Sequence, residues 1–235
     1  MKQGFWITGT DTGVGKTLVT CALMRAFSRQ GQTVLGMKPV AAGTEWVNGR
    51  ACNEDVVQFQ AHATVSAPLA WINPYCFTQP IAPHLAAANE KRTIDVAHVE
   101  ACFLQLSALA DVVLVEGAGG FCVPLDATAG MDTLAQRLAL PVILVVGLRL
   151  GCLNHALLTA EAIKNRGLTL AGWVANQIDP EMAYPLENCH TLVQRLHAPL
   201  IGSIAFEPDP DPVKMGGLLS IAELVIQKNP TSPVT

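Results

Sequence analysis

Residues 9–17 read Gly9-Thr10-Asp11-Thr12-Gly13-Val14-Gly15-Lys16-Thr17, and they follow the short apolar run Phe5-Trp6-Ile7. An apolar strand that passes into a glycine-rich turn ending in Gly-Lys-Thr is typical of a phosphate-binding loop. The glycines let backbone N–H groups face a polyphosphate, Lys16 neutralises its outer charges, and the Thr17 hydroxyl can ligate Mg²⁺. A helix starting near Lys16 adds its positive N-terminal end to the same site. The stretch therefore predicts a site for a nucleotide triphosphate.

The loop departs from the usual pattern in its spacing. Four residues normally separate its two glycines, whereas Gly9 and Gly15 enclose five, and Thr10 stands at the position of the standard glycine. The extra residue makes this loop a variant and narrows the families to which it can belong.

Length, composition and charge limit the class of protein. Half of the 235 residues are hydrophobic and 14% are charged, which suits a single α/β domain with a large core over residues 1–228 and a disordered tail at 229–235. No apolar stretch is long enough for a bilayer span, and no signal-peptide pattern is present. The net charge of −4, without a Lys/Arg cluster, gives no support for binding nucleic acid or a membrane surface. Seven dispersed cysteines without a CxxC pair predict reduced thiols rather than a zinc site. We expect a cytoplasmic protein.

Apolar runs alternate with segments of helical period along most of the chain. The expected strands are Gly4–Thr8, Val34–Val40, Val112–Glu116, Val142–Val146, Leu170–Asn176 and Leu200–Ile204. The expected helices are Lys16–Gln30, Val96–Ala108, Thr133–Leu138, Leu153–Arg166, Leu186–Leu196 and Leu218–Gln227, with surface loops at Ala41–Asn53 and Pro68–Pro83. Continuous apolar runs favour parallel strands that are covered on both faces. The alternation predicts an α/β fold with a doubly wound, mainly parallel sheet and helices on both faces, similar to P-loop NTP hydrolases.

Polar residues at the ends of the predicted strands are candidates for the site, because ligands in such sheets lie at the carboxyl ends of the strands. Lys38 ends one strand and is either a surface charge or a second cation for the transferring phosphoryl group. Glu116 ends the run Val112-Val113-Leu114-Val115 and precedes a glycine-rich turn. That layout matches the acidic element through which P-loop proteins hold Mg²⁺, and it favours a metal ligand over a structural glutamate.

Three further polar positions each have two readings. Asp55 opens a helical stretch, as an N-terminal helix acid or as a carboxylate of the site. Asn176 ends a strand, where its amide can pair with a purine or can form a turn. The segment Leu150–His155 opens a helix whose free N–H groups can hold a carboxylate, unless Asn154 is a local cap.

In this order, these residues resemble the dethiobiotin synthetase family of biotin biosynthesis. The similarity covers nearly the whole chain, to about residue 206, and includes the five-residue spacing of the phosphate loop. The other matching motifs are Lys38-Pro39-Val40-Ala41, Asn73-Pro74-Tyr75, Pro83-His84, Val115-Glu116-Gly117-Ala118-Gly119-Gly120, Pro141–Gly147, Leu150-Gly151-Cys152-Leu153-Asn154-His155 and Leu168–Asn176.

The resemblance implies an ATP- and Mg²⁺-dependent ring closure. In this reaction 7,8-diaminononanoate takes up CO₂ on one amine as a carbamate, and the carbamate oxygen attacks the γ-phosphate. The second amine then displaces phosphate from the mixed anhydride and closes the ring of dethiobiotin.

The resemblance also implies roles for individual residues. Thr12, Lys16 and Lys38 would be catalytic, and Thr17, Asp55 and Glu116 would hold Mg²⁺. The ATP-binding residues would be Gly13, Val14, Gly15, Lys16, Thr17, Leu18, Asp55, Glu116, Gly117, Ala118, Gly119, Asn176 and Gln177, the last two at the adenine. The substrate would contact Thr12, Lys38, Gly151, Cys152, Leu153 and Asn154. Because the helix start at 151–154 would come from a partner subunit, the resemblance implies a homodimer with sites at its interface.

Two departures from the family pattern stand out. Ala42 replaces a serine that is common in the family, so a hydroxyl contact to substrate is missing. Residues 206–212, which should border the adenine, are rich in Pro and Asp.

Two other protein classes compete with this interpretation. A nucleotide switch ATPase of the partition or septum-positioning class shares the fold, but Asp11 occupies the position of its signature lysine. A cobyrinate-type amide synthase would need a glutaminase domain for which the chain has no room.

Overall fold

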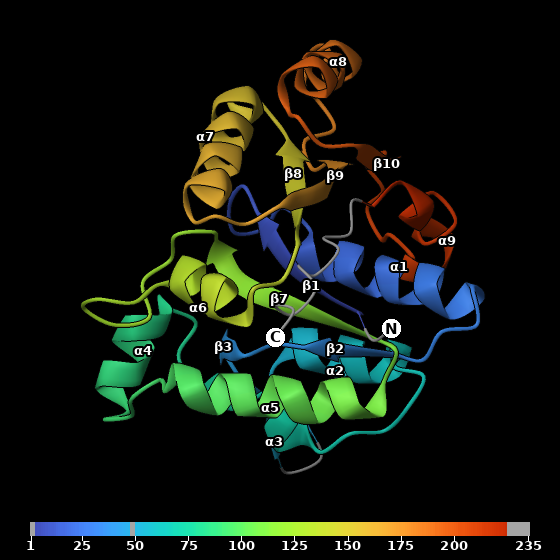
Figure 1. The fold of residues 1–235 in the computed structure, drawn as a ribbon. Helices are drawn as coiled ribbons and strands as arrows, with labels where there is room; N and C mark the ends of the chain where they lie inside the picture. Colours follow the sequence, from blue (N-terminus) through green and yellow to red (C-terminus); the bar gives the residue numbers. More distant parts are fainter. Residues whose placement is uncertain (1–2, 48–49, 225–235) are drawn as a thin grey trace, which may run out of the picture.

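The predicted apolar strands form one six-stranded sheet in a computed structural model, which describes residues 3–47 and 50–224 (Figure 1). The strand order is β10-β9-β8-β1-β7-β2, and the neighbouring strands pair in parallel. The strands are β1 (Gln3–Gly9), β2 (Val34–Met37), β7 (Val112–Gly120), β8 (Val142–Leu148), β9 (Leu170–Gln177) and β10 (Leu200–Ile204). Because the strands are parallel, their carboxyl ends meet at one edge, where β1, β7 and β2 deliver the polar residues of the candidate site.

Helices cover both faces of this sheet (Figure 1). Their bounds are α1 (Lys16–Arg29), α2 (Glu54–His62), α3 (Leu69–Ile72), α4 (Pro83–Asn89), α5 (Val96–Leu109), α6 (Met131–Leu138), α7 (Cys152–Asn165), α8 (Pro185–Arg195) and α9 (Pro212–Met215). Helices α1, α2 and α9 pack against one face, and α5, α6, α7 and α8 pack against the other. The doubly wound α/β fold predicted from the sequence is thus confirmed.

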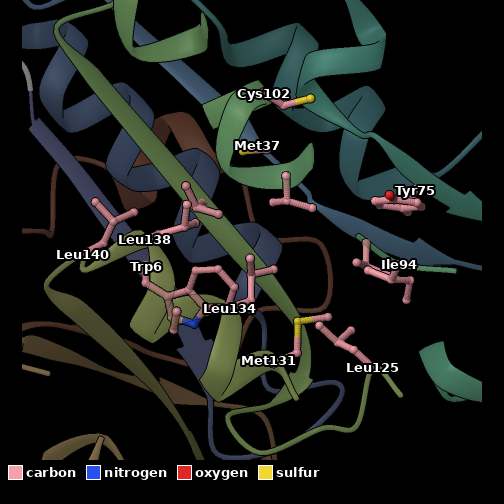
Figure 2. Packing of buried hydrophobic residues seen from close by; sticks show 14 of the residues in the cluster. Trp6, Met37, Tyr75, Ile94, Cys102, Leu125, Met131, Leu134, Leu138 and Leu140 are labelled. Atoms are coloured by element: carbon pink, nitrogen blue, oxygen red, sulfur yellow. The ribbon is translucent and has the colours of Figure 1, made fainter. Parts of the chain in front are cut away.

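The core lies on both sides of the sheet because successive residues of a strand point to opposite faces. In β1, Phe5 and Ile7 join the cluster under α1, whereas Trp6 joins the cluster under α5 and α6. Figure 2 shows Trp6 within this second cluster, together with residues of α6 such as Leu134. The continuous apolar runs of the sequence therefore reflect burial on two faces, as expected for parallel strands.

One predicted strand, Val34–Val40, is wrong in its second half. Strand β2 ends at Met37, and Val40 begins the short strand β3 (Val40–Ala42), which pairs with β6 (Tyr75–Phe77) outside the main sheet. Pro39 has no N–H to continue the sheet ladder, and the Lys38 N–H donates to the carbonyl of Ile72 instead (2.8 Å). Lys38 therefore leaves the sheet at the point where the site begins.

The two predicted surface loops contain regular structure. Ala41–Asn53 includes the end of β3 and a hairpin of β4 (Glu45–Val47) and β5 (Arg50–Cys52), and Pro68–Pro83 includes α3 and β6. Each of these strands has only three residues, so its periodicity is too short to identify it.

The predicted helix Leu218–Gln227 is wrong over its described part. Residues 218–224 hold only a turn and a short 3₁₀ helix, η1 (Ile221–Glu223). The Ser220 N–H donates to the carbonyl of Ile201 in β10 (2.7 Å), and Leu219 and Leu224 pack into the core under α1. Tertiary contacts therefore override the local helical pattern. The predicted tail at 229–235 and the domain limit at 228 lie outside the described residues.

Within the part of the chain that the structure describes, none of the helices combines the length and apolarity needed to cross a membrane.

Candidate active site

The phosphate-loop stretch forms the turn between β1 and α1. Gly13 and Gly15 adopt positive φ angles of 74° and 85°, a conformation that L side chains rarely take. Gly15 caps α1, whose free N–H groups open toward the turn. The Lys16 ammonium folds back over the loop and donates to the carbonyl of Asp11 (2.9 Å). The loop is therefore shaped as a cradle for an anion.

A cavity of about 710 Å³ lies beside this loop at the carboxyl edge of the sheet. It is lined by Thr12, Gly13, Gly15, Lys16, Thr17, Lys38, Ala42, Asn53, Asp55, Pro80, Ile81, Ala82, Pro83, Glu116, Ala118, Gly119 and Val123. We call the charged residues of this lining the charged wall, and the apolar residues, such as Ile81 and Val123, the apolar wall. Such a cavity can hold a polar reacting group at one end and a hydrocarbon chain at the other.

The charged wall is organised around Lys38. Its ammonium nitrogen lies 2.7 Å from Glu116 Oε1 and 2.7 Å from Asp55 Oδ2. Burial alone would lower the pKa of Lys38, but the two carboxylates outweigh burial and hold its pKa above the usual value. The same ion pair holds the pKa of Asp55 below its usual value, although burial acts in the opposite direction. Lys38 is therefore a charged, buried group rather than a surface lysine.

Lys16 lies in a different environment. Burial lowers its pKa to about 8, and the attraction of Glu116 offsets this only in part. Its ammonium donates to a neutral carbonyl, whereas the ammonium of Lys38 donates to carboxylates. The loop therefore holds a cation whose charged form a bound anion would stabilise.

Three oxygen-bearing side chains converge beside Lys38. The Thr17 hydroxyl lies 2.7 Å from Asp55 Oδ1 and 3.1 Å from Glu116 Oε1. Hydroxyl and carboxylate oxygens are the donors that Mg²⁺ prefers, and Mg²⁺ sites commonly take only one or two carboxylates, with phosphate and water completing the shell. The ammonium of Lys38 lies 2.7 Å from an oxygen of each carboxylate, so these oxygens already surround a positive charge. The donor set thus fits a magnesium ion. Among the described residues, no group of three or more His, Cys, Asp or Glu side chains that could hold a metal ion is found, and the donor set here has two carboxylates and one hydroxyl.

Asn53 positions Asp55. The sequence predicted the start of this helix but not the role of Asn53. The Asn53 side chain caps α2 by accepting from the Asp55 N–H (3.1 Å) and donates to the carbonyl of Gly43 (2.8 Å). The predicted helix start is confirmed, and the helix turns Asp55 toward Thr17 and Lys38.

The structure places other predicted residues away from this cavity. Asn176 is buried and donates to the carbonyl of Val14 (2.9 Å), so that its amide supports the phosphate loop from below. Gln177 donates to the carbonyl of Asp179 (3.2 Å). Leu18 lines a second cavity of about 470 Å³, together with Asp209 and other residues of the 209–212 segment.

The helix start at Gly151–Asn154 does not line the 710 Å³ cavity of its own chain. It begins α7, two residues after Arg149, whose guanidinium forms an ion pair with Asp11 of the phosphate loop at 2.5 Å. The two segments are therefore neighbours on the surface, and Leu150 between them is 95% exposed.

Sequence reasoning missed two features of the site. The apolar wall at 80–83 gives no local signal, because only the chain's course brings it to the cavity. Thr20 was also missed, although it follows Lys16 by four residues and Thr17 by three and so shares their side of α1. Its hydroxyl lies 2.6 Å from Glu116 Oε2.

Comparison with known proteins identifies similar chains. A family model described as an AAA domain matches residues 3–214. The chain is 51% identical over 219 residues to an ATP-dependent dethiobiotin synthetase BioD of Aromatoleum aromaticum, covering 93% of this chain and 97% of that protein. It is 50% identical over 224 residues to the protein of the same name from Nitrosospira multiformis, covering 95% and 97%.

Solved structures share the fold at much lower identity. The septum site-determining protein MinD of Pyrococcus horikoshii, in complex with Mg-ADP, matches with a TM-score of 0.59 and 17% identity, covering 88% of this chain and 83% of that one. A ParA family ATPase from Chlorobium tepidum matches with a TM-score of 0.55 and 14% identity, covering 89% and 87%. These structural similarities establish the architecture alone. The family is shown by the near-full-length matches at 50–51% identity.

Proposed function

Because the chain belongs to the family of ATP-dependent dethiobiotin synthetases, which are ligases, we propose that it closes the ureido ring of dethiobiotin. The substrates are 7,8-diaminononanoate, CO₂ and ATP, and the products are dethiobiotin, ADP and phosphate. The reaction passes through a carbamate on one amine and a carbamic–phosphoric anhydride. We propose that the reaction takes place in the cytoplasm.

The chemistry explains why the site needs both a phosphate loop and a second cation. A carbamate does not react with an amine because oxide would have to leave, and phosphorylation supplies a better leaving group. In that step the carbamate oxygen bonds to the γ-phosphorus, and the bond from this phosphorus to the bridging oxygen of ADP breaks. Because an anion attacks an anion, fixed positive charges must stabilise the transition state.

Lys16 and Lys38 are suited to supply these charges from two directions. Lys16 lies over the phosphate loop, and Lys38 directly follows β2, the strand next to β7. Both line the cavity with Thr12, to which we assign a contact with the carbamate end of the substrate. We assign to Lys38 the contact with the carbamate and the transferring phosphoryl group, and to Lys16 the outer phosphates of ATP.

Magnesium would be held by Thr17, Asp55 and Glu116, whose oxygens converge as described. When bound there, it supplies charge neutralisation at the phosphate oxygens. Lys38 contacts the same two carboxylates and so holds them in a fixed orientation for the metal.

Asn176 can support the phosphate loop and pair with adenine at the same time. An amide side chain has two N–H donors and one acceptor, and within the described residues Asn176 uses one donor, on the Val14 carbonyl. The remaining donor and the acceptor can pair with adenine, with Gln177 beside it. The phosphate contacts then fall to residues 13–18 and to the turn at 116–119.

The distal carboxylate of the diamine would rest on the free N–H groups at Gly151–Asn154 of a partner subunit. This helix start lies outside the cavity of its own chain, and the nearly fully exposed Leu150 beside it suits a surface that a second copy covers. We therefore propose a homodimer with the substrate site at the interface.

The main support for this proposal is that two cations and three oxygen-bearing side chains line one cavity that also has an apolar wall. These residues are Lys16, Lys38, Thr17, Asp55 and Glu116. A nucleotide switch shares the fold, but Asp11 stands where such a protein has its signature lysine, and it pairs with Arg149.

The decisive experiment mixes the purified protein with ATP, Mg²⁺, bicarbonate and 7,8-diaminononanoate. We expect phosphate release that depends on the diamine, with dethiobiotin identified by mass spectrometry. ATP hydrolysis at the same rate with and without the diamine would reject the proposal.

A further inference from the structure

Thr20 makes a buried contact with the acidic side chain of the site. It lies in the second turn of α1, is fully buried, and its Oγ1 is 2.6 Å from Glu116 Oε2. The carboxylate of Glu116 is itself completely buried. The short distance is typical of a hydroxyl that donates to a charged oxygen.

The hydroxyl has a single proton, and its acceptors can be compared. Besides Glu116 Oε2, the carbonyl of Lys16 lies within reach at 2.9 Å. A carboxylate is the stronger acceptor and is also the nearer one here. The proton of Thr20 therefore points to Glu116, and the contact with its own helix is secondary.

The two oxygens of Glu116 consequently have separate partners. Oε2 accepts from Thr20, whereas Oε1 faces Lys38 at 2.7 Å and Thr17 at 3.1 Å. A carboxylate held at one oxygen cannot rotate without losing that hydrogen bond. Its other oxygen is then presented in one direction, toward the site.

We propose that Thr20 is a positioning residue, which anchors Glu116 Oε2 so that Oε1 faces the magnesium position. The inference rests on the proposed function, in which Glu116 is a metal ligand. Partners that orient a metal ligand commonly affect metal affinity by 10- to 100-fold. Thr20 thus belongs to the metal-binding machinery without touching the metal.

The competing explanation is that Thr20 only bonds back to its own helix, as threonines in helices often do. The chain supplies a matched control. Thr191 of α8 donates to the carbonyl four residues earlier, Glu187, at 2.8 Å and is not among the residues lining the cavity. Replacing each threonine by valine removes the same helix contact, but only Thr20→Val frees a carboxylate of the site.

The test measures metal affinity directly, by titrating the protein–ADP complex with Mn²⁺ and following free Mn²⁺ by electron paramagnetic resonance. We expect Thr20→Val to weaken Mn²⁺ binding at least tenfold, Thr20→Ser to bind within about twofold of the natural protein, and Thr191→Val to be unchanged. ADP affinity in EDTA should be the same in all four proteins. Natural Mn²⁺ affinity in folded Thr20→Val, or a loss in Thr20→Ser as large as in Thr20→Val, would overturn the proposal.

A double-mutant cycle tests whether the effect passes through Glu116. In a Glu116→Gln background, Thr20→Val should cost little further Mn²⁺ affinity, because the anchored carboxylate is already gone. An undiminished further loss would overturn the proposal. Should Thr20→Val fail to fold, Thr20→Cys keeps the side-chain size, offers only a weak donor and carries the same expectation. Diamine-dependent phosphate release tests the proposed function separately, so that the two can fail independently.

Discussion

Lys38 and Glu116 form a buried ion pair of 2.7 Å although 78 residues separate them in the chain. The register of the sheet explains the pair, because Met37 of β2 stands opposite Val115 of β7. The next residue of each strand therefore arrives at the same place on the carboxyl edge. Lys38 is held at the site by this pair and by Asp55, and we expect its removal to affect both catalysis and stability.

Lys38→Ala should lower turnover about 100- to 1000-fold while ADP affinity stays within a few-fold. Loss of one fixed donor to a developing negative charge commonly has this effect on the rate, and Lys16 remains to hold the phosphates. Steady-state rates with the diamine and calorimetric ADP binding check both parts. Lys164→Ala, at the exposed C-terminal end of α7, is the control, and a natural rate in Lys38→Ala would remove Lys38 from the active site.

The same variant should lose stability without magnesium. Deleting one partner of a buried ion pair leaves the other charge uncompensated and costs about 3–5 kcal/mol. Because Mg²⁺ can replace the missing charge between Glu116 and Asp55, we expect it to restore part of this loss. Urea unfolding with EDTA and with Mg²⁺ measures the difference. Equal destabilisation under both conditions would argue against a metal site at these carboxylates.

Ala42→Ser should tighten binding of the diamine. Ala42 lines the same cavity as Lys38 and Ile81, and one added hydrogen bond contributes about 1 kcal/mol, or roughly a fivefold lower KM. The kcat should change little. Ala42→Cys adds an atom of similar size with only a weak donor and should give a smaller gain. An unchanged KM in Ala42→Ser would show that the hydroxyl has no partner here.

Gly15→Ala should impair ADP binding far more than Gly13→Ala. Both glycines have positive φ, so alanine costs about 1–2 kcal/mol of backbone strain at either position. A Cβ at position 13 meets nothing within 4 Å, whereas a Cβ at position 15 would lie 2.2 Å from Asn176 Nδ2. Calorimetric ADP titrations compare the two variants. Asn176→Ala should recover part of the loss in Gly15→Ala, and equal effects of the two single variants would contradict this account.

ADP affinity measured in EDTA should fall as the pH rises through about 8. Burial lowers the pKa of Lys16 to about 8 in the free protein, and the phosphates bind its charged form. Below this pH Lys16 already carries its proton, whereas above it each binding event must take one up, at a cost of up to tenfold in affinity per pH unit. Phosphate groups are already fully ionised in this range.

Calorimetry at pH 7 to 9.5 in two buffers of different ionisation enthalpy measures both the affinity and the proton uptake. Lys38 should not contribute, because its pKa is raised. Lys16→Arg should bind ADP without this pH dependence, since arginine keeps its charge. Constant affinity up to pH 9.5 in the natural protein would contradict the lowered pKa.

Features that depend only on neighbouring residues could be predicted from the amino-acid sequence. The phosphate loop, five of the six predicted strands and the helix starts at Lys16 and Glu54 follow from glycine positions, apolar runs and capping residues, which act over a few residues. The resemblance to a family needed only the order of such motifs along the chain. These features were predictable because their causes are local.

Other features depend on contacts between segments that are far apart in the chain. Pro39 ends β2 and sends Val40 to a second small sheet, and contacts with β10 hold residues 218–224 out of a helix. Residues 80–83 contribute to the cavity lining, a position that no local sequence pattern predicts. Pairing and packing partners far apart in the chain override local preference in each case.

The charge state of the site was also settled only by the fold. The sequence left Lys38 either a surface charge or a second cation, and the helical spacing of Thr20 from Lys16 did not show what Thr20 contacts. Parallel register brings Lys38 beside Glu116, and the packing of α1 on β7 brings Thr20 to the other carboxylate oxygen. Burial and pairing then fix which groups are charged, since both depend on the surroundings of a side chain rather than on its neighbours in sequence.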